Sequence, residues 1–304
     1  MLKRKDLLGL KDLTTEEIED ILSSAVEMRK QLDKGVRKTA HLQGKSVVTL
    51  FYENSTRTRT SFEAAAKITG ATTTSISAQT SSVTKGETLI DTGRNLDALL
   101  MDAIIIRHSM SGAPHLLAKN VKASVINAGD GMNEHPTQAL LDILTVKNAF
   151  NSLKGLKVVI SGDIKYSRVA RSNIWGMTKL GADVKVVAPK TLLPLEIEQM
   201  GCSVSCDMDE AIVGANVVMG LRLQLERQQA GLFPSAKEYH EYFGITESRL
   251  RLADSNALVM HPGPVNRGVE MSSDVIDGDN SVILEQVTNG VAVRMAVLNM
   301  LIGN

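Results

Sequence analysis

The pattern of hydrophobic and polar positions predicts a long series of alternating strands and helices. A first helix should begin at Thr14, where Glu17 completes a capping box, and end near Gly35. Apolar, β-branched runs predict buried strands, and amphipathic stretches predict the helices that separate them. In the first half, strands are expected at 46–52, 71–77, 102–106 and 123–127, and helices at 55–69, 86–98, 111–119 and 136–149. In the second half, strands are expected at 156–161, 183–188, 202–206, 215–219 and 257–260.

Strict alternation of this kind is typical of doubly wound α/β domains built on parallel sheets. The chain has 304 residues, a length that suits two domains, and the polar segment NSLKG at 151–155 marks a junction. We therefore expect one domain at 1–150 and a second at 151–280. The last stretch, 281–304, has a long helical pattern, and we expect it to pack back on the first domain.

The composition favours a function that involves small molecules, not nucleic acid or a membrane. Apolar residues make up 43% and aromatic residues 3%, so the cores should be aliphatic. Lysine plus arginine and aspartate plus glutamate both count 34, which leaves no overall field to attract nucleic acid or a membrane surface. The first residues, MLKRKDLLGLKDL, are interrupted by charges, and no segment approaches a membrane span, so a cytoplasmic location is expected. Cys202 and Cys206 should be free, because on a strand they lie roughly 13 Å apart.

The segment STRTR at 55–59 places two arginines at a predicted strand-to-helix turn. A helix N-terminus already carries about half a positive charge, so cations are unfavourable there unless an anion is bound. Ser55 or Thr56 could instead only cap the helix. We expect Arg59 to pair with Glu63 one turn later, and the other four residues to bind a phosphate. Those four are Ser55, Thr56, Arg57 and Thr58.

Further polar residues follow other predicted strands, where ligands collect in parallel sheets. Arg107 follows three isoleucines and adds a second guanidinium to the same anion site, although it could simply reach solvent. His135 and Gln138 are three residues apart and can share one face of a helix that starts near Pro136. A lone histidine is more often structural, but this one lies at the mouth of the inferred phosphate site.

Taken in order, these motifs resemble the aspartate branch of the aspartate/ornithine carbamoyltransferase family over almost the whole chain. The motifs are STRTRTSFE, SSVTKGETLIDT, RH, NAGDGMNEHPTQ, GDIKYSRV, RLQLER and HPGPVNRG. The resemblance implies transfer of the carbamoyl group of carbamoyl phosphate to the amine of L-aspartate, giving N-carbamoyl-L-aspartate and phosphate in de novo pyrimidine biosynthesis. The alternative is another amino-acid acceptor, such as ornithine. The family's active site, which lies between two domains, is expected here too.

The resemblance also assigns roles to individual residues. It implies that the carbamoyl phosphate site contains Ser55, Thr56, Arg57, Thr58, Ser81, Arg107, His135, Gln138, Pro262 and Gly263. Aspartate is expected to bind Lys85, Arg168, Arg222 and Gln224. The residues expected to act directly on the reaction are Arg57, Thr58, Lys85, Arg107 and His135. Pro262 and Gly263 are expected to use their backbone carbonyls, which accept from the carbamoyl NH2.

The chemistry independently suits these residue types. An amine that attacks a carbamoyl carbon builds negative charge on the carbonyl oxygen, so fixed donors such as Arg107 and His135 lower the barrier. A dicarboxylate acceptor needs separate cations, and Arg168 and Arg222 can serve as bidentate clamps. No side-chain nucleophile is required, and neither a cofactor nor a metal is expected. Without the resemblance, Arg168 and Arg171 could be solvated helix charges, and Arg222 and Gln224 an exposed strand face.

The resemblance further implies a cyclic homotrimer with shared active sites. Ser81 and Lys85 match a loop that the neighbouring subunit donates, and regulatory or other pathway chains are possible partners. Two departures from the family pattern are visible. Gly263 replaces a bulkier apolar residue, so its carbonyl is expected to be held less rigidly, and Thr84 replaces a second lysine beside Lys85.

Two rival functions remain open on the sequence alone. A nucleotide-dependent dehydrogenase is suggested by LKVVISGDIKYSRVA, but that segment has only Gly162 of a three-glycine fingerprint. A two-domain receptor for an anionic metabolite is the non-enzymatic alternative. Such a receptor has no evident use for both His135 and Lys85.

Overall fold

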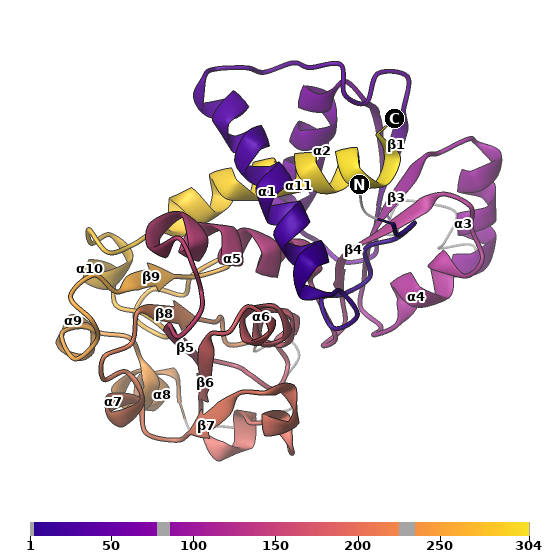
Figure 1. The fold of residues 1–304 in the computed structure, drawn as a ribbon. Coiled ribbons are helices and arrows are strands. Elements are labelled where there is room, and N and C mark those ends of the chain that lie inside the picture. Colours follow the sequence, from indigo (N-terminus) through magenta and orange to yellow (C-terminus); the bar gives the residue numbers. More distant parts are fainter. Residues whose placement is uncertain (1–2, 78–85, 225–234, 304) are drawn as a thin grey trace. The chain divides into compact units, whose positions relative to one another are not determined.

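The computed structural model describes residues 3–77, 86–224 and 235–303, and it divides into two compact units (Figure 1). Unit 1 comprises Met1–Leu141 and Thr288–Asn304, and unit 2 comprises Asp142–Val287. By packing, the chain therefore divides somewhat before the polar junction at 151–155. The functional boundaries expected from the sequence, 1–150 and 151–280, stay predictions.

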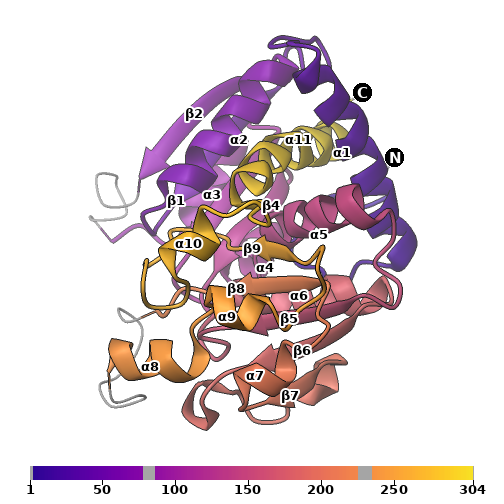
Figure 2. The ribbon, with the colours of Figure 1, turned by 90° about the vertical axis from the view of Figure 1, so that its left-hand side faces the viewer.

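Unit 1 is built on a parallel four-stranded sheet in the order β2-β1-β3-β4. Its strands are β1 (Ser46–Phe51), β2 (Thr72–Ser77), β3 (Ala103–His108) and β4 (Ser124–Asp130). Its helices are α1 (Thr15–Asp33), α2 (Thr56–Thr69), α3 (Leu89–Ala98), α4 (Ala113–Ala118), the first part of α5 (Pro136–Phe150) and the larger part of α11 (Ile283–Ile302). Helix α2 packs on β1 and β2, as Figure 2 shows, and α4 packs on β3 and β4.

Unit 2 is built on a parallel five-stranded sheet in the order β7-β6-β5-β8-β9. Its strands are β5 (Lys157–Ser161), β6 (Asp183–Val187), β7 (Ser203–Ser205), β8 (Val217–Gly220) and β9 (Leu258–Met260). Its helices include α6 (Arg168–Lys179), α7 (Met208–Ala211), α8 (Ala236–Phe243), α9 (Glu247–Leu250) and α10 (Ser273–Ile276). Two short 3-10 turns lie at Lys190–Leu192 and Ile197–Met200. The two parallel sheets with flanking helices confirm the predicted α/β class.

The packing of the two cores explains why the strands could be predicted from the sequence. In unit 1, alternate positions of β1 and β3 face one core cluster, which contains Val48, Leu50, Ile104 and Ile106. In unit 2, single valines from β5, β6, β8 and β9 meet in the same way. Strands buried on both faces need continuous aliphatic runs, and these are the runs that the sequence shows.

Helix ends also form where their sequence signals lie. Thr14 and Glu17 make both bonds of the predicted capping box at the start of α1. Helix α2 ends at Gly70, whose φ of +94° is left-handed. This backbone conformation disfavours any side chain at position 70. A side chain would also clash, because an added Cβ would lie 2.7 Å from the carbonyl oxygen of Thr39. Both cysteines are free as expected, with Cys202 buried and Cys206 exposed.

In the part of the chain that the structure describes, no helix is long and apolar enough to cross a membrane.

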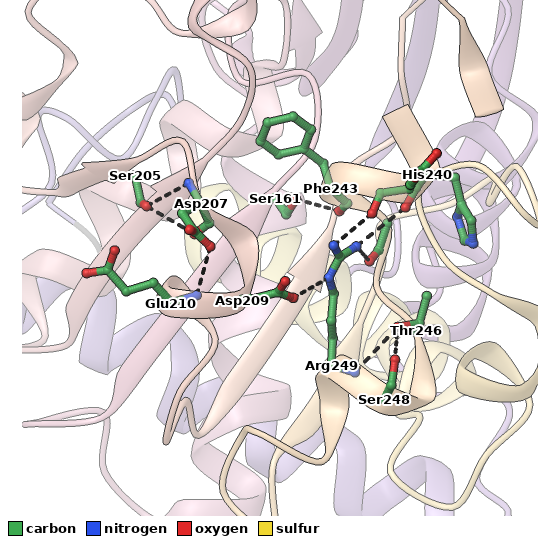
Figure 3. A network of polar contacts seen from close by, with 12 residues as sticks. Ser161, Ser205, Asp207, Asp209, Glu210, His240, Phe243, Thr246, Ser248 and Arg249 are labelled. Atoms are coloured by element: carbon green, nitrogen blue, oxygen red, sulfur yellow. Dashed lines mark hydrogen bonds and ion pairs between the residues drawn. The ribbon is translucent and has the colours of Figure 1, made fainter. Parts of the chain in front are cut away.

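The carboxyl end of α8 is fastened by the side chain of Arg249 (Figure 3). Its guanidinium donates to the carbonyl oxygens of Gly244 at 2.7 Å and Glu241 at 2.8 Å, and to a carboxylate oxygen of Asp209 at 2.6 Å. These carbonyls are among those that a helix end leaves without intrahelical donors. Arg249 therefore joins α7, α8 and α9 through one side chain.

Replacing this arginine should destabilise unit 2. We expect Arg249→Ala to lower the free energy of unfolding in urea by about 1–3 kcal/mol, because several carbonyls lose a charged donor. The matched control is Asp209→Asn, which removes only an exposed ion pair and should cost less than about 1 kcal/mol. Equal losses for the two variants would show that the carbonyl contacts contribute nothing.

Candidate functional site

The first turn of α2 carries the segment predicted to bind an anion. Ser55 is the N-cap residue, with extended backbone, and its side chain makes no capping hydrogen bond. The turn contains no acidic residue; Thr56 and Arg57 are exposed, and Thr58 is buried. The hydroxyl of Ser55 is thus not used as a cap. A turn with backbone N–H donors, hydroxyl groups and a guanidinium can bind a phosphate.

Arg59 corrects one expectation from the sequence. Among the described residues there is no ion pair between Arg59 and Glu63. The guanidinium of Arg59 lies over the ring of Phe51, 5.2 Å from its centre, and a carboxylate oxygen of Glu63 accepts from the hydroxyl of Ser75 at 2.8 Å. The predicted pair was wrong because each residue has a partner on a neighbouring strand. The spacing of residues along a helix does not indicate partners on other elements.

Arg107 lies near this turn because of the strand register. It pairs with Phe51 across β1 and β3, so its side chain starts beside the carboxyl end of β1. Its Nε lies 3.4 Å from a carboxylate oxygen of Glu53, and its Nη1 donates to the carbonyl oxygen of Ala128 at 3.3 Å. Glu53 was not predicted as a site residue. Its position two residues before STRTR was the available signal.

His108, next to Arg107, is a neutral neighbour of the site. Burial lowers its pKa, and the nearby carboxylates of Glu53 and Asp130 oppose that shift. Its Nδ1 accepts from the backbone N–H of Met110 at 2.9 Å, and its ring packs against Tyr52. An accepting Nδ1 requires an unprotonated nitrogen, which agrees with the direction of the shift.

His135 and Gln138 lie at the start of α5, as predicted. Both side chains are buried, and the carbonyl oxygen of His135 accepts from the backbone N–H of Gln138 at 3.0 Å. Pro136 occupies the first helical position, where a missing N–H costs nothing. The structure therefore places this histidine and this amide on one rigid helix start.

Two buried carboxylates hold the turn that precedes His135. Asp130 accepts from the backbone N–H of Glu134 at 3.1 Å and from the side chain of Asn127 at 2.8 Å. The carboxylate of Glu134 accepts from the backbone N–H groups of Leu10 at 2.6 Å and Lys11 at 3.2 Å. The partners of Glu134 lie more than 120 positions away along the chain, so no local sequence pattern could indicate them.

In unit 2, Arg168 repeats the arrangement of α2. It is the first residue of α6, it is buried, and the first turn of that helix contains no acidic residue. Ser167 caps the helix by accepting from the backbone N–H of Ala170 at 3.2 Å. A buried guanidinium at a helix N-terminus is again an arrangement that favours a negatively charged ligand.

Arg222 and Gln224 follow β8 in irregular backbone. Leu221 and Leu223, which alternate with them, are buried, whereas Arg222 and Gln224 are partly exposed. The backbone N–H of Gln224 donates to a carboxylate oxygen of Asp163 at 3.2 Å, and the other oxygen accepts from the backbone N–H of Tyr166 at 3.0 Å. Asp163 was not predicted, yet it ties the segment of Arg222 to the loop that leads into α6.

Pro262 and Gly263 follow β9, and both are partly buried. Gly263 has a φ of +65°, a left-handed conformation that favours glycine.

Ser81 and Lys85 lie outside the described residues. Within those residues, no cluster of three or more histidine, cysteine or acidic side chains could hold a metal ion.

The structure thus defines an α/β protein whose cations and helix N-termini follow the carboxyl ends of parallel strands. Residues 5–148 match the carbamoyl-phosphate-binding domain of the aspartate/ornithine carbamoyltransferases, and residues 154–301 match their aspartate/ornithine-binding domain. The chain belongs to this family and is a carbamoyltransferase.

Similar curated proteins indicate the aspartate branch of this family. The chain is 64% identical over 300 residues to the aspartate carbamoyltransferase catalytic subunit of Ruminiclostridium cellulolyticum, covering 99% of this chain and 96% of that protein. It is also 64% identical over 301 residues to the corresponding subunit of Acetivibrio thermocellus, with the same coverage.

Solved structures share the fold across both branches of the family. Aspartate transcarbamoylase from Trypanosoma cruzi, in complex with carbamoyl phosphate and aspartate, superposes with a TM-score of 0.87 at 31% identity, covering 98% of this chain and 97% of that one. Ornithine carbamoyltransferase from Pyrococcus furiosus gives 0.87 at 33% identity, covering 97% and 96%. The fold alone therefore does not separate the acceptors, whereas the curated relatives do.

The two arginines of the α2 turn should behave differently. Arg57→Ala is expected to lose roughly 3 kcal/mol or more of transition-state stabilisation, the range for a preorganised charged donor. Arg59→Ala should mainly lower stability, because its guanidinium packs on Phe51. Carbamoyl-transfer kinetics and urea unfolding of both variants measure the two effects. A slow, fully stable Arg59→Ala beside an active, destabilised Arg57→Ala would contradict this assignment of the turn.

Proposed function

We propose that this chain carbamoylates the amine of L-aspartate with carbamoyl phosphate, releasing N-carbamoyl-L-aspartate and phosphate. The reaction is a step of de novo pyrimidine synthesis, and a cytoplasmic location suits it. The observation that carries the proposal is the pair of helix N-termini, on α2 and α6, whose first turns hold arginine and no acid. The curated relatives that match the whole chain bear the name of this activity.

The proposed roles follow from the chemistry of each group. Ser55, Thr56, Arg57 and Thr58 receive the phosphate, whose leaving charge they stabilise. Arg107 and His135 donate to the carbonyl oxygen as negative charge builds on it. Gln138 and the carbonyls of Pro262 and Gly263 accept from the carbamoyl NH2, so that carbamoyl and acetyl groups are distinguished. That these residues of both units serve one active site stays a prediction.

The acceptor is held by separate cations. Arg168 and Arg222 are proposed to bind the two carboxylates of aspartate, with Gln224 beside them. Lys85, which lies outside the described residues, is proposed to contribute with Ser81 from the neighbouring subunit of a homotrimer. Holding two substrates in line supplies much of the rate without any covalent intermediate.

Acceptor choice tests the proposal. L-Aspartate should be carbamoylated, while L-ornithine should react on the order of 100-fold more slowly or worse, because its second ammonium would face arginine. A colorimetric assay for the carbamoylated product, with each acceptor at saturating carbamoyl phosphate, measures both rates. Faster turnover of ornithine would place the chain in the other branch.

A variant pair on α6 checks the proposed aspartate contact. Arg168→Ala should raise the KM for aspartate by about tenfold or more, since a bidentate charged contact is lost. Arg171→Ala is the matched control, one helical turn later and partly exposed, and it should leave that KM nearly unchanged.

Mixing two inactive variants tests the shared site. Arg57→Ala and Lys85→Ala trimers would be dissociated, mixed in equal amounts and reassembled. In a mixed cyclic trimer, one interface joins an intact Arg57 to a neighbour's intact Lys85, so about a quarter of wild-type activity should return. Confirmed subunit exchange without recovered activity refutes the shared site, and an active Lys85→Ala parent removes Lys85 from catalysis.

A further inference from the structure

The loop that follows β9 is held by a histidine that the proposed reaction does not use. Nδ1 of His261 accepts from the backbone N–H of Gly263 at 2.8 Å. The N–H of Gly263 shares a peptide plane with the carbonyl of Pro262, so this hydrogen bond fixes that carbonyl directly and holds the start of the residue that carries the second carbonyl. Gly263 has no side chain to pack, and the sequence alone suggested a loosely held carbonyl there. The bond to His261 restrains Gly263 through its N–H.

The opposite edge of the His261 ring faces a buried carboxylate. Nε2 of His261 lies 3.4 Å from Oε1 of Glu270, and the two residues are only 1% and 2% exposed. The same oxygen accepts from the backbone N–H of Asn266 at 2.9 Å. Glu270 therefore contacts both the ring that supports the start of the loop and the backbone at its far end.

The backbone of His261 is fixed from a third direction. Its N–H donates to Oε1 of Gln286 at 3.0 Å, and the amide nitrogen of Gln286 donates to Asp142 at 2.7 Å. Asp142 in turn accepts from the side chain of Asn173 at 2.8 Å. All four side chains are buried, so the position of the imidazole ring is set by its surroundings.

We propose that His261 and Glu270 are positioning residues, which hold the Pro262–Gly263 carbonyls in place for the carbamoyl NH2. The inference rests on the proposed function of these carbonyls. An accepting Nδ1 must be unprotonated, so the ring is neutral and carries its proton on Nε2. Glu270, facing Nε2, favours that tautomer. The carboxylate orients the ring, and the ring orients the loop.

Two substitutions at position 261 separate this role from simple core packing. His261→Asn keeps an oxygen at the place of Nδ1 but leaves Glu270 without its neighbour. His261→Gln reaches the place of Nε2 and Glu270 but offers no acceptor to Gly263. The positioning role therefore predicts that glutamine is the more damaging change, whereas a role limited to filling space beside Glu270 predicts the reverse.

The readout is discrimination between carbamoyl phosphate and acetyl phosphate, which carries a methyl group in place of the NH2. Titration calorimetry gives the ratio of the two dissociation constants. His261→Gln should reduce the wild-type preference for carbamoyl phosphate about tenfold, the value of one hydrogen bond, while His261→Asn should stay within about threefold. Arg267→Gln is the control in the same loop, because it removes only an exposed pair with Asp277 and should leave the ratio unchanged.

The outcomes keep the two proposals apart. Equal weakening of both ligands by His261→Gln, or greater damage from His261→Asn, overturns the positioning role. Wild-type protein that forms no carbamoyl-aspartate would overturn the proposed function instead, and would do so without any variant.

A measurement on the wild-type protein covers the case in which neither variant folds. With glycine and histidine labelled by 15N, the Gly263 amide should show a scalar coupling across the hydrogen bond to a histidine ring nitrogen. Observation of that coupling supports the inference. Its absence, or a protonated Nδ1 on His261, overturns it.

Discussion

The electrostatics of a helix N-terminus is the constraint on which the proposed function depends. At the start of α2, a partial positive charge from the backbone meets Arg57, with no acid in the first turn to offset it. At the start of α6, Arg168 creates the same situation while buried. Each arrangement favours the binding of an anion. A reaction between an acyl phosphate and a dicarboxylate supplies an anion for each.

The parallel sheets bring residues from separate loops close together. Because strands in a parallel sheet share one direction, the loops that leave their carboxyl ends lie together at one edge. The register of β1 and β3 places Arg107 beside Phe51, a few residues before the α2 turn. His135 follows β4, the next strand in the order. Within unit 1, the predicted phosphate residues are thus delivered by neighbouring strands of one sheet.

Local signals in the sequence were sufficient for the fold. Buried strands such as β1 and β3 have continuous aliphatic runs, the capping box of Thr14 and Glu17 is complete within four residues, and Gly70 ends α2. For the second half only the strands and the last helix were predicted, and α6 to α10 were not. Three of these, α7, α9 and α10, have four residues each, too few to show a helical period. The expected pair of Arg59 and Glu63 was wrong for a related reason, since the competing partners lie on strands.

The supports of the site could not be predicted, because they depend on contacts between distant segments. Glu134 binds the backbone of Leu10 and Lys11, and Gln286 binds both His261 and Asp142. In the sequence each is one polar residue among many. Only the fold shows that Glu134 and Gln286 are buried and hydrogen-bonded to distant segments. Each of them adjoins, or holds backbone that adjoins, a residue that the sequence motifs had singled out.

Phosphate binding by the α2 turn is the central claim, and thermal unfolding measures it directly. A ligand that binds only the folded state raises its stability by RT ln(1 + [L]/Kd). The unfolding midpoint of the wild-type protein should therefore rise steadily with inorganic phosphate at constant ionic strength, and Arg57→Ala should lose most of that rise. A wild-type midpoint that does not respond to phosphate, or an equal rise in the variant, would contradict the account.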